Sequence, residues 1–324
     1  MTERLDHFMA RANAAYYATR DPFADFTTAP EISQVFGELL GLWAAVTWRL
    51  LDRPSPVSIV EMGPGRGTLM ADALRAIVRA APDFRAAATI HLIETSSRLR
   101  DAQRERIGDA VWHDALDTVP EQTLIVLGNE FLDALPIRQF VRRGIGWTER
   151  YVGPEGLAER TTDYDPTIEA EEGDVIERRA PAEAIAGDLA ARLVRHRGAA
   201  LFLDYGSEAS GTGDSLQAIS GGRPGDPLGA PGSADLTAHV DFARFGEAAK
   251  AAGAQIHGPI PQGIFLARLG LFQRTNQLAR RLPPKRAAEM MEGARRLAEP
   301  DRMGRLFKAI TLISPGTATP PGFE

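Results

Sequence analysis

The chain has 324 residues, of which 44% are hydrophobic and 25% charged, as in an ordinary globular protein of one large or two modest domains. It contains no cysteine, which excludes disulfides, thiolate nucleophiles and cysteine-containing metal sites. Its net charge of −6 gives no general attraction to DNA or to an anionic membrane. The longest strongly apolar stretch, residues 39–48, is about half of the ~20 residues that a membrane span needs. We therefore expect a cytoplasmic protein without a DNA partner or membrane insertion.

A long helix is predicted to begin near Thr28. Pro30 suits the first turn of a helix, and Glu31 suits its positive end. Apolar residues then recur at helical spacing from Ile32 to Leu50, with Val46 on the same face. The pattern therefore indicates one helix with a single buried face.

Strands and helices alternate after this helix. Apolar runs at 57–62, 89–94, 111–113 and 123–127 predict four strands. Thr68 is expected to cap the helix that follows the first strand, and Ser96 to open the helix that follows the second. Strands that alternate with helices at this spacing predict parallel βαβ units and a doubly wound α/β sheet.

The second half of the chain is less regular. Residues 137–141 and 147–152 predict an antiparallel hairpin, and residues 206–232, with eight glycines, predict a mobile loop. The C-terminal residues 314–324 are expected to be frayed. The remaining expected elements are helices at 181–197, 242–252 and 264–297, and strands at 199–204, 254–257 and 308–313. The core therefore carries an insertion after strand four, at about 135–198, and a helical insertion before the last strand, at about 262–305.

A glycine-rich turn follows the first of these strands. Gly63, Pro64, Gly65 and Gly67 lie between that strand and the next helix, which is where α/β sheets bind ligands. Glycine allows a sharp turn and lets a ligand approach the backbone closely. A purely structural turn remains an alternative for this motif considered alone.

Three acidic residues near the ends of successive strands favour one class of ligand. Glu61 precedes the first glycine by two positions, where it would repel a pyrophosphate but attract an ammonium or sulfonium group. Glu94 ends the second strand, where a carboxylate can accept both hydroxyls of a ribose, and Asp114 follows the third, where an adenine amino group would lie. S-adenosyl-L-methionine carries all of these groups. A nicotinamide dinucleotide is the alternative, although its Gly-x-Gly-x-x-Gly spacing is absent here.

Long segments of the chain resemble one known family. The runs TTAPEISQVFGELLGLW, EMGPGRGTLMADALR, HLIETSSRLRDAQ, GNEFLDALPIRQF, FLDYG, ADLTAHVDF and MGRLFKAI are similar to the MidA-like family, which includes the arginine methyltransferase that assists assembly of mitochondrial complex I. The resemblance implies a Rossmann-like class I methyltransferase sheet that binds S-adenosyl-L-methionine. It also implies ω-N-methylation of an arginine on a complex I subunit, in the mitochondrial matrix for eukaryotic relatives. The composition here suggests a bacterial cytoplasm instead.

The resemblance also assigns the N-terminal segment. Residues 1–53 would form a helical lid on the methyltransferase core of residues 54–324, with Thr28, Pro30 and Glu31 folded over the cofactor pocket. A plain helix cap is the alternative for these three. Two departures from the family pattern fall on the expected acceptor side: residues 21–26 look shortened, and glycines at 221–222 replace an expected histidine.

Candidate catalytic residues are the polar groups at the carboxyl ends of later strands. Glu130 could hold a protonated guanidinium and accept a proton, with Asn129 orienting the acceptor. Cofactor binding or a turn cap is the alternative for Glu130, and a buried structural hydrogen bond is the alternative for Asp204, the second candidate. The six histidines are scattered, so we expect no metal site. Methylation of another nitrogen, on a small molecule or RNA, and an assembly chaperone that binds S-adenosyl-L-methionine with little turnover are the other functions considered.

Overall fold

A central sheet of mostly parallel strands organises the fold. The computed structural model describes residues 2–20 and 27–324. The strands of this sheet run in the order β15–β16–β10–β5–β2–β3–β4, and β14 also pairs with β10. The five strands from β10 to β4 are parallel, whereas β16 and β15 are antiparallel at one edge. The strands are β2 (Val57–Met62), β3 (Ala88–Ile93), β4 (Val111–His113), β5 (Leu124–Asn129), β10 (Gly198–Ser207), β14 (Val240–Asp241), β15 (Gln255–Pro261) and β16 (Phe307–Ile313). This topology confirms the predicted α/β class.

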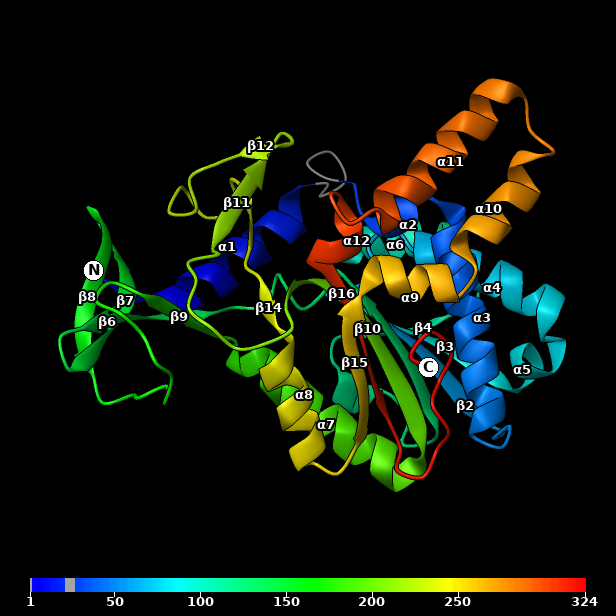
Figure 1. Cartoon of the computed structure of the whole chain (residues 1–324), viewed down its shortest axis with the longest axis horizontal. Coiled ribbons are helices and arrows are strands. Elements are labelled where there is room, and N and C mark those ends of the chain that lie inside the picture. The colour runs from blue at the N-terminus through cyan, green and yellow to red at the C-terminus, as the bar shows by residue number, and fades with distance from the viewer. Residues whose placement is uncertain (1, 21–26) are drawn as a thin grey trace.

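Helices cover both faces of the central sheet. Every residue of β2 and β5 is buried, as expected for strands with helices on either side. Helices α3 (Gln34–Leu50), α4 (Thr68–Ala80) and α5 (Pro82–Ala87) lie on one face, and α7 (Ala180–His196) and α8 (Phe242–Ala251) on the other (Figure 1). α7 falls within the expected insertion of residues 135–198 but packs against the core.

A separate antiparallel sheet, here called the accessory sheet, is formed by the rest of that insertion and the N-terminus. Its strands are β1 (Glu3–Arg4), β6 (Arg138–Arg143), β7 (Gly146–Gly153), β8 (Gly156–Thr162) and β9 (Val175–Arg178). The pairing of β6 with β7 confirms the predicted hairpin. Nothing in the sequence predicts the pairing of β1 with β7, about 150 residues away.

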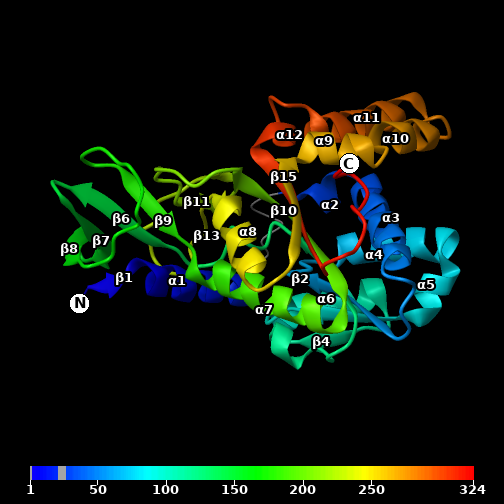
Figure 2. The ribbon, with the colours of Figure 1, turned by 60° about the horizontal axis from the view of Figure 1, so that its bottom comes forward.

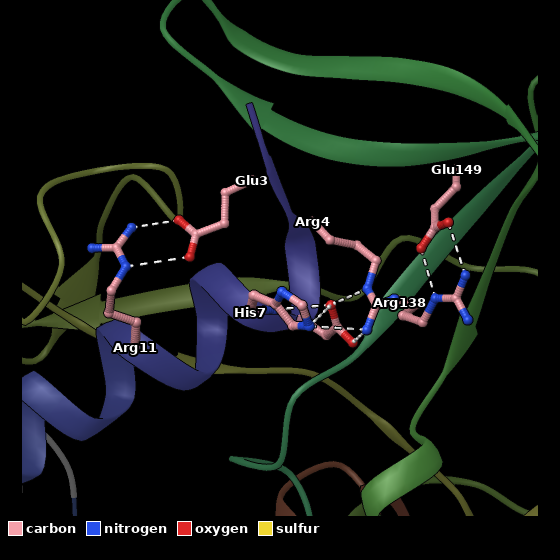
Figure 3. Close-up of polar contacts among 7 residues, drawn as sticks. Glu3, Arg4, His7, Arg11, Arg138 and Glu149 are labelled. Carbon is pink, nitrogen blue, oxygen red and sulfur yellow. Dashed lines mark hydrogen bonds and ion pairs between the residues drawn. The ribbon is translucent and has the colours of Figure 1, made fainter. Parts of the chain in front are cut away.

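Ion pairs tie the N-terminal helix α1 (Leu5–Thr19) to β1, the strand that pairs with β7 of this sheet. Figure 3 shows Glu3 paired with Arg11 within the N-terminal segment, beside the bidentate pair of Arg138 and Glu149 that joins β6 to β7. From there α1 runs towards the central sheet (Figure 2). The helix therefore links the accessory sheet to the core.

Three helix predictions need correction. The expected single helix is two: α2 (Ala29–Ile32) ends at Ser33, whose side chain accepts a hydrogen bond from the Val35 N–H and so begins α3. Val46 lies on the exposed side of α3. Thr68 does not cap α4, because Gly67, in a left-handed conformation, occupies the cap position.

Two segments expected to lack order are structured. Within residues 206–232, β11 (Gln217–Ser220) pairs with β12 (Arg223–Pro224) and with β13 (Asp235–Thr237) to form a small sheet. At the C-terminus, the Phe323 ring lies 5.1 Å from that of Phe265 between centroids, and Thr317 is buried. Packing of the partly buried Phe323 ring against the core gives this tail a fixed place where fraying was expected.

Four helices separate β15 from β16, where the helical insertion was expected. They are α9 (Gln262–Arg268), α10 (Leu271–Ala279), α11 (Pro284–Ala298) and α12 (Met303–Leu306). α11 packs against α2, since a Cβ at Gly293 would lie 3.0 Å from the carbonyl oxygen of Ile32. In the described ranges, no helix combines the length and apolarity that a bilayer crossing requires.

Candidate functional site

A cavity of about 670 Å³ lies at the carboxyl ends of the parallel strands. Its floor is formed by the ends of β2, β3, β4 and β5, and its walls by α1 and by the segment from Thr28 to Glu31. All but two of the candidate residues line it: Thr28, Pro30, Glu31, Glu61, Gly63, Pro64, Gly65, Glu94, Asp114, Asn129 and Glu130. Gly67 and Asp204 do not.

The glycine-rich turn has the backbone that its sequence requires. Gly63, Gly65 and Gly67 have φ angles of 65°, 53° and 76°, in the region that favours glycine. A Cβ at Gly63 would lie 2.9 Å from the ring of Phe131, and a Cβ at Gly67 would lie 2.8 Å from the side chain of Ile107 on α6 (Ser97–Ile107). Gly63 and Gly65 therefore shape the cavity, and Gly67 allows the turn to pack closely on α6.

Two buried polar atoms beside this turn lack a partner among the described residues. They are Oε2 of Glu61 and Oδ1 of Asn129, and both residues line the cavity. Burial raises the pKa of Glu61 to about 8, only partly offset by the hydrogen bond that its carboxyl group accepts from the Met70 N–H. Unsatisfied acceptors in a cavity of this size fit a ligand with ammonium and hydroxyl donors. S-adenosyl-L-methionine has both donors, so the residues present fit this cofactor.

Glu94 and Asp114 differ in their freedom to bind a ligand. Oε1 of Glu94 accepts a hydrogen bond from the Ser96 N–H at 2.8 Å, and burial raises the pKa of this carboxyl group. Asp114 is 80% exposed at its side chain and forms an ion pair of 2.6 Å with Arg100. Both residues line the cavity, although Asp114 already has a cationic partner.

Glu130 joins the end of β5 to the segment that covers the cavity. It has a φ of 48°, and its Oε1 accepts hydrogen bonds from the Ala29 N–H at 2.9 Å and from the Asn129 amide at 3.0 Å. Glu130 thus supplies the cap of α2 that the side chain of Thr28 does not provide. Burial raises the pKa of Glu130 to about 7. A carboxyl group with this pKa can hold or release a proton near neutral pH.

Glu31 fastens α2 on the opposite side of the cavity. Its carboxylate accepts a hydrogen bond from the Thr68 hydroxyl and lies 3.8 Å from Arg106 of α6. Thr68, which failed as a helix cap, therefore serves to hold Glu31. The segment around Pro30 is thus attached both to the glycine-rich turn and to Glu130.

Asp204 does not have the position expected of a catalytic residue. It is fully buried, and its Oδ2 accepts hydrogen bonds from the N–H groups of Phe131, Leu132 and Asp133 at 2.8–3.1 Å. Its Oδ1 accepts one from the N–H of Tyr205 at 2.9 Å. Backbone donors therefore occupy both oxygens, which supports the structural alternative: Asp204 holds the turn that carries Glu130.

One wall of the cavity is formed by α1, which lies within the helical lid expected for residues 1–53, but its lining residues were not among the candidates. Ala10, Ala14 and Ala18 recur at the four-residue spacing of one helix face, and with Asn13 and Tyr17 they line the cavity. Asn13 donates hydrogen bonds to the carbonyl oxygens of Ala134 and Leu236, which fixes the helix there. The small-residue spacing was visible in the sequence, but nothing in it showed what the helix faces. Within the described ranges, no cluster of histidine and acidic residues is suited to hold a metal ion.

The chain is similar to known proteins along nearly its whole length. Residues 39–260 match the model of a family described as "Putative S-adenosyl-L-methionine-dependent methyltransferase". The chain is 34% identical to the Drosophila melanogaster mitochondrial protein arginine methyltransferase NDUFAF7 homolog, over 97% of this chain and 81% of that protein. Identity to the human protein arginine methyltransferase NDUFAF7 is 31%, over 97% of this chain and 79% of that protein. A crystal structure from Burkholderia thailandensis, bound to S-adenosyl-homocysteine, matches with a TM-score of 0.81 and 28% identity, over 99% of this chain and 90% of that one.

Proposed function

Because the chain belongs to the family of S-adenosyl-L-methionine-dependent methyltransferases, we propose that it methylates an ω-nitrogen of an arginine on a subunit of respiratory complex I and thereby supports assembly of that complex. The choice of acceptor rests on the similarity to protein arginine methyltransferases along 97% of the chain. Glu130, buried in the cavity, supplies the carboxylate that an arginine acceptor needs. In a bacterial host, the reaction would take place in the cytoplasm.

The cofactor would lie along the strand ends. In this arrangement Glu61 faces the positively charged part of the ligand, Glu94 accepts the ribose hydroxyls and Asp114 lies near the adenine. Gly63, Pro64 and Gly65 allow close approach of the backbone, while Gly67 supports the turn from behind. Thr28, Pro30 and Glu31 cover the ligand from α2. When bound, S-adenosyl-L-methionine supplies an electrophilic methyl group on a sulfonium.

Glu130 would act on the acceptor. A guanidinium group has a pKa above ~12 and arrives protonated, so a carboxylate is needed to pair with it and to fix one nitrogen in line with the methyl carbon. The nitrogen gains a methyl group and loses one proton, which Glu130 can take up because burial raises its pKa to about 7. Within the described residues, both hydrogen bonds that Glu130 accepts fall on Oε1, which leaves Oε2 for the guanidinium. Asn129 holds Glu130 in this orientation.

Mass spectrometry of complex I subunits tests the proposal. Subunits isolated from a strain that lacks the gene are incubated with the purified protein and methyl-labelled S-adenosyl-L-methionine. Labelled methyl on a subunit arginine supports the proposal, whereas label on another nitrogen would replace the acceptor. Assembly that is fully restored by a Glu130→Gln variant without any methylation would favour the chaperone function instead.

A further inference from the structure

Gln103 on α6 is fully buried, and both its amide nitrogen and its amide oxygen form hydrogen bonds. Its amide nitrogen donates to the carbonyl oxygen of Gly65 at 2.7 Å and also lies 3.4 Å from Oε2 of Glu94. Its amide oxygen accepts a hydrogen bond from the Trp112 indole N–H at 2.7 Å. Gln103 does not itself line the cavity. It therefore contacts two parts of the cofactor cradle from behind.

The surroundings of Gln103 fix its orientation. The indole N–H can only donate, so it requires the amide oxygen on its side and turns the amide nitrogen towards Gly65 and Glu94. Trp112 is held in turn by Arg104, whose guanidinium carbon lies 4.8 Å from the ring centroid. Close packing of Gly67 on α6 brings the turn within reach, since a Cβ there would lie 3.4 Å from Cγ of Gln103. The donor side of the amide is thus fixed before any ligand binds.

We propose that Gln103 is a positioning residue that couples the glycine-rich turn to Glu94, so that the turn and the acid present one rigid surface to the ribose of the cofactor. The proposal rests on the proposed cofactor contacts of Glu94 and Gly65, but not on the identity of the methyl acceptor. Glu94 then has Oε1 held by the Ser96 N–H and Oε2 held by Gln103. Its remaining lone pairs are directed at the ribose hydroxyls.

Loss of the amide donor should change the acid strength of Glu94. The hydrogen bonds from Ser96 and Gln103 lower the pKa of this carboxyl group against the larger effect of burial, which raises it. Removing the Gln103 donor therefore raises the pKa of Glu94 further. A carboxyl group must be ionised to accept both ribose hydroxyls, so binding should fail at a higher pH than in the wild type.

Other charged groups around Glu94 are the same in the variant and the wild type. They are Arg100 on α6, which lowers the pKa of Glu94, and Asp114, Tyr17 and Glu61, which line the cavity from β4, α1 and β2. Because these groups titrate alike in both proteins, they do not contribute to the difference in affinity between the variant and the wild type at a given pH. The difference then reports on Glu94 and Gln103.

The test is calorimetric titration of Gln103→Met with S-adenosylhomocysteine between pH 5 and 8. We expect the affinity to fall about tenfold at pH 7, and its decline on the acid side to move to higher pH. Gln139→Met is the matched control, because Gln139 is also fully buried and bridges Glu177, Asp214 and Arg150 in the accessory sheet, away from the cavity. Gln139→Met should leave both the affinity and its pH profile unchanged.

Two further proteins separate the possible outcomes. In a double-mutant cycle with Glu94→Gln, the effects of the two substitutions should be less than additive, because Gln103 acts through Glu94. An unchanged affinity in Gln103→Met while Glu94→Gln weakens binding would overturn the role of Gln103 alone. If Glu94→Gln itself binds normally, the ribose contact is wrong as well. Should Gln103→Met fail to fold, Gln103→Glu keeps an acceptor for Trp112 but replaces the donor with a second carboxyl group beside Glu94, whose repulsion should move the acid-side decline further towards high pH than loss of the donor alone.

Discussion

Binding of the cofactor should expel a proton from Glu61. Burial raises the pKa of Glu61 to about 8, so at pH 7 about nine-tenths of the free protein carries this group protonated. A ligand that places its ammonium group, which S-adenosylhomocysteine shares with S-adenosyl-L-methionine, against the unpartnered Oε2 stabilises the carboxylate and lowers its pKa. Close to one proton should then be released for each molecule bound at pH 7.

The same coupling fixes a pH dependence of the affinity. Ionising Glu61 at pH 7 costs about 1.4 kcal/mol for the one unit that separates the pH from a pKa of about 8. The ligand must offset this cost, so affinity should rise about tenfold for each pH unit up to 8 and then level off. Glu61→Gln has no proton to release, and its affinity should not follow this slope.

Calorimetry with S-adenosylhomocysteine at pH 7, in phosphate and in Tris, measures the release directly, because the two buffers take up protons with different enthalpies. Glu149→Gln is the control: Glu149 is also a buried acid but is paired with Arg138 in the accessory sheet, away from the cavity. We expect the buffer-dependent enthalpy in the wild type and in Glu149→Gln, and its loss in Glu61→Gln. Equal enthalpies in both buffers for the wild type, or a release that persists in Glu61→Gln, would refute the reasoning.

Three other substitutions test the remaining parts of the site. Glu130→Gln should slow methyl transfer at least about 100-fold yet bind S-adenosylhomocysteine normally, since its amide oxygen can still accept from Ala29. In the wild type at saturating cofactor, kcat/KM for the methyl acceptor should fall below pH 7, where Glu130 becomes protonated, and a flat rate profile would contradict this role. Gly65→Val should abolish S-adenosylhomocysteine binding, because a φ of 53° strains a β-branched residue and the side chain would enter the cavity; an unchanged titration would show that the pocket is misplaced. Asp204→Asn should lower the free energy of unfolding in urea by about 2 kcal/mol, because the four backbone N–H groups that Asp204 binds would share one amide oxygen in place of two carboxyl oxygens, and should leave the pH profile of transfer unchanged. Normal stability combined with lost activity would instead restore a catalytic role for Asp204.

The features best predicted from the sequence are those that depend on residues close together in the chain or on the general topology of a parallel sheet. Buried strands with helices between them could be placed from apolar runs alone, and the positive φ angles of Gly63, Gly65 and Gly67 follow from the need for a sharp turn. The acids at strand ends could be brought to one cavity because parallel strands share an edge. Each of these inferences needs only neighbouring residues and the topology of a parallel sheet.

Other features could not be predicted because they depend on contacts between residues that lie far apart in the sequence. Nothing near Asp204 in the sequence shows that the N–H groups of residues 131–133 surround it, and these contacts are what favour the structural alternative over the catalytic one. The order of the C-terminal tail depends on where Phe323 meets Phe265, and the glycine-rich segment is ordered by its pairing with β13. Thr68 looked like a helix cap because its long-range partner, Glu31, is 37 residues away.

The wall formed by α1 also has a consequence for the order in which the chain can fold during synthesis. Asn13 leaves the ribosome long before its hydrogen-bond partners, which lie 121 and 223 residues later in the chain. Contacts of such long sequence separation form slowly, and an unpaired helix must wait for them. A nascent chain interrupted between Ala134 and Leu236 would therefore hold this wall of the cofactor cavity by only one of its two anchors.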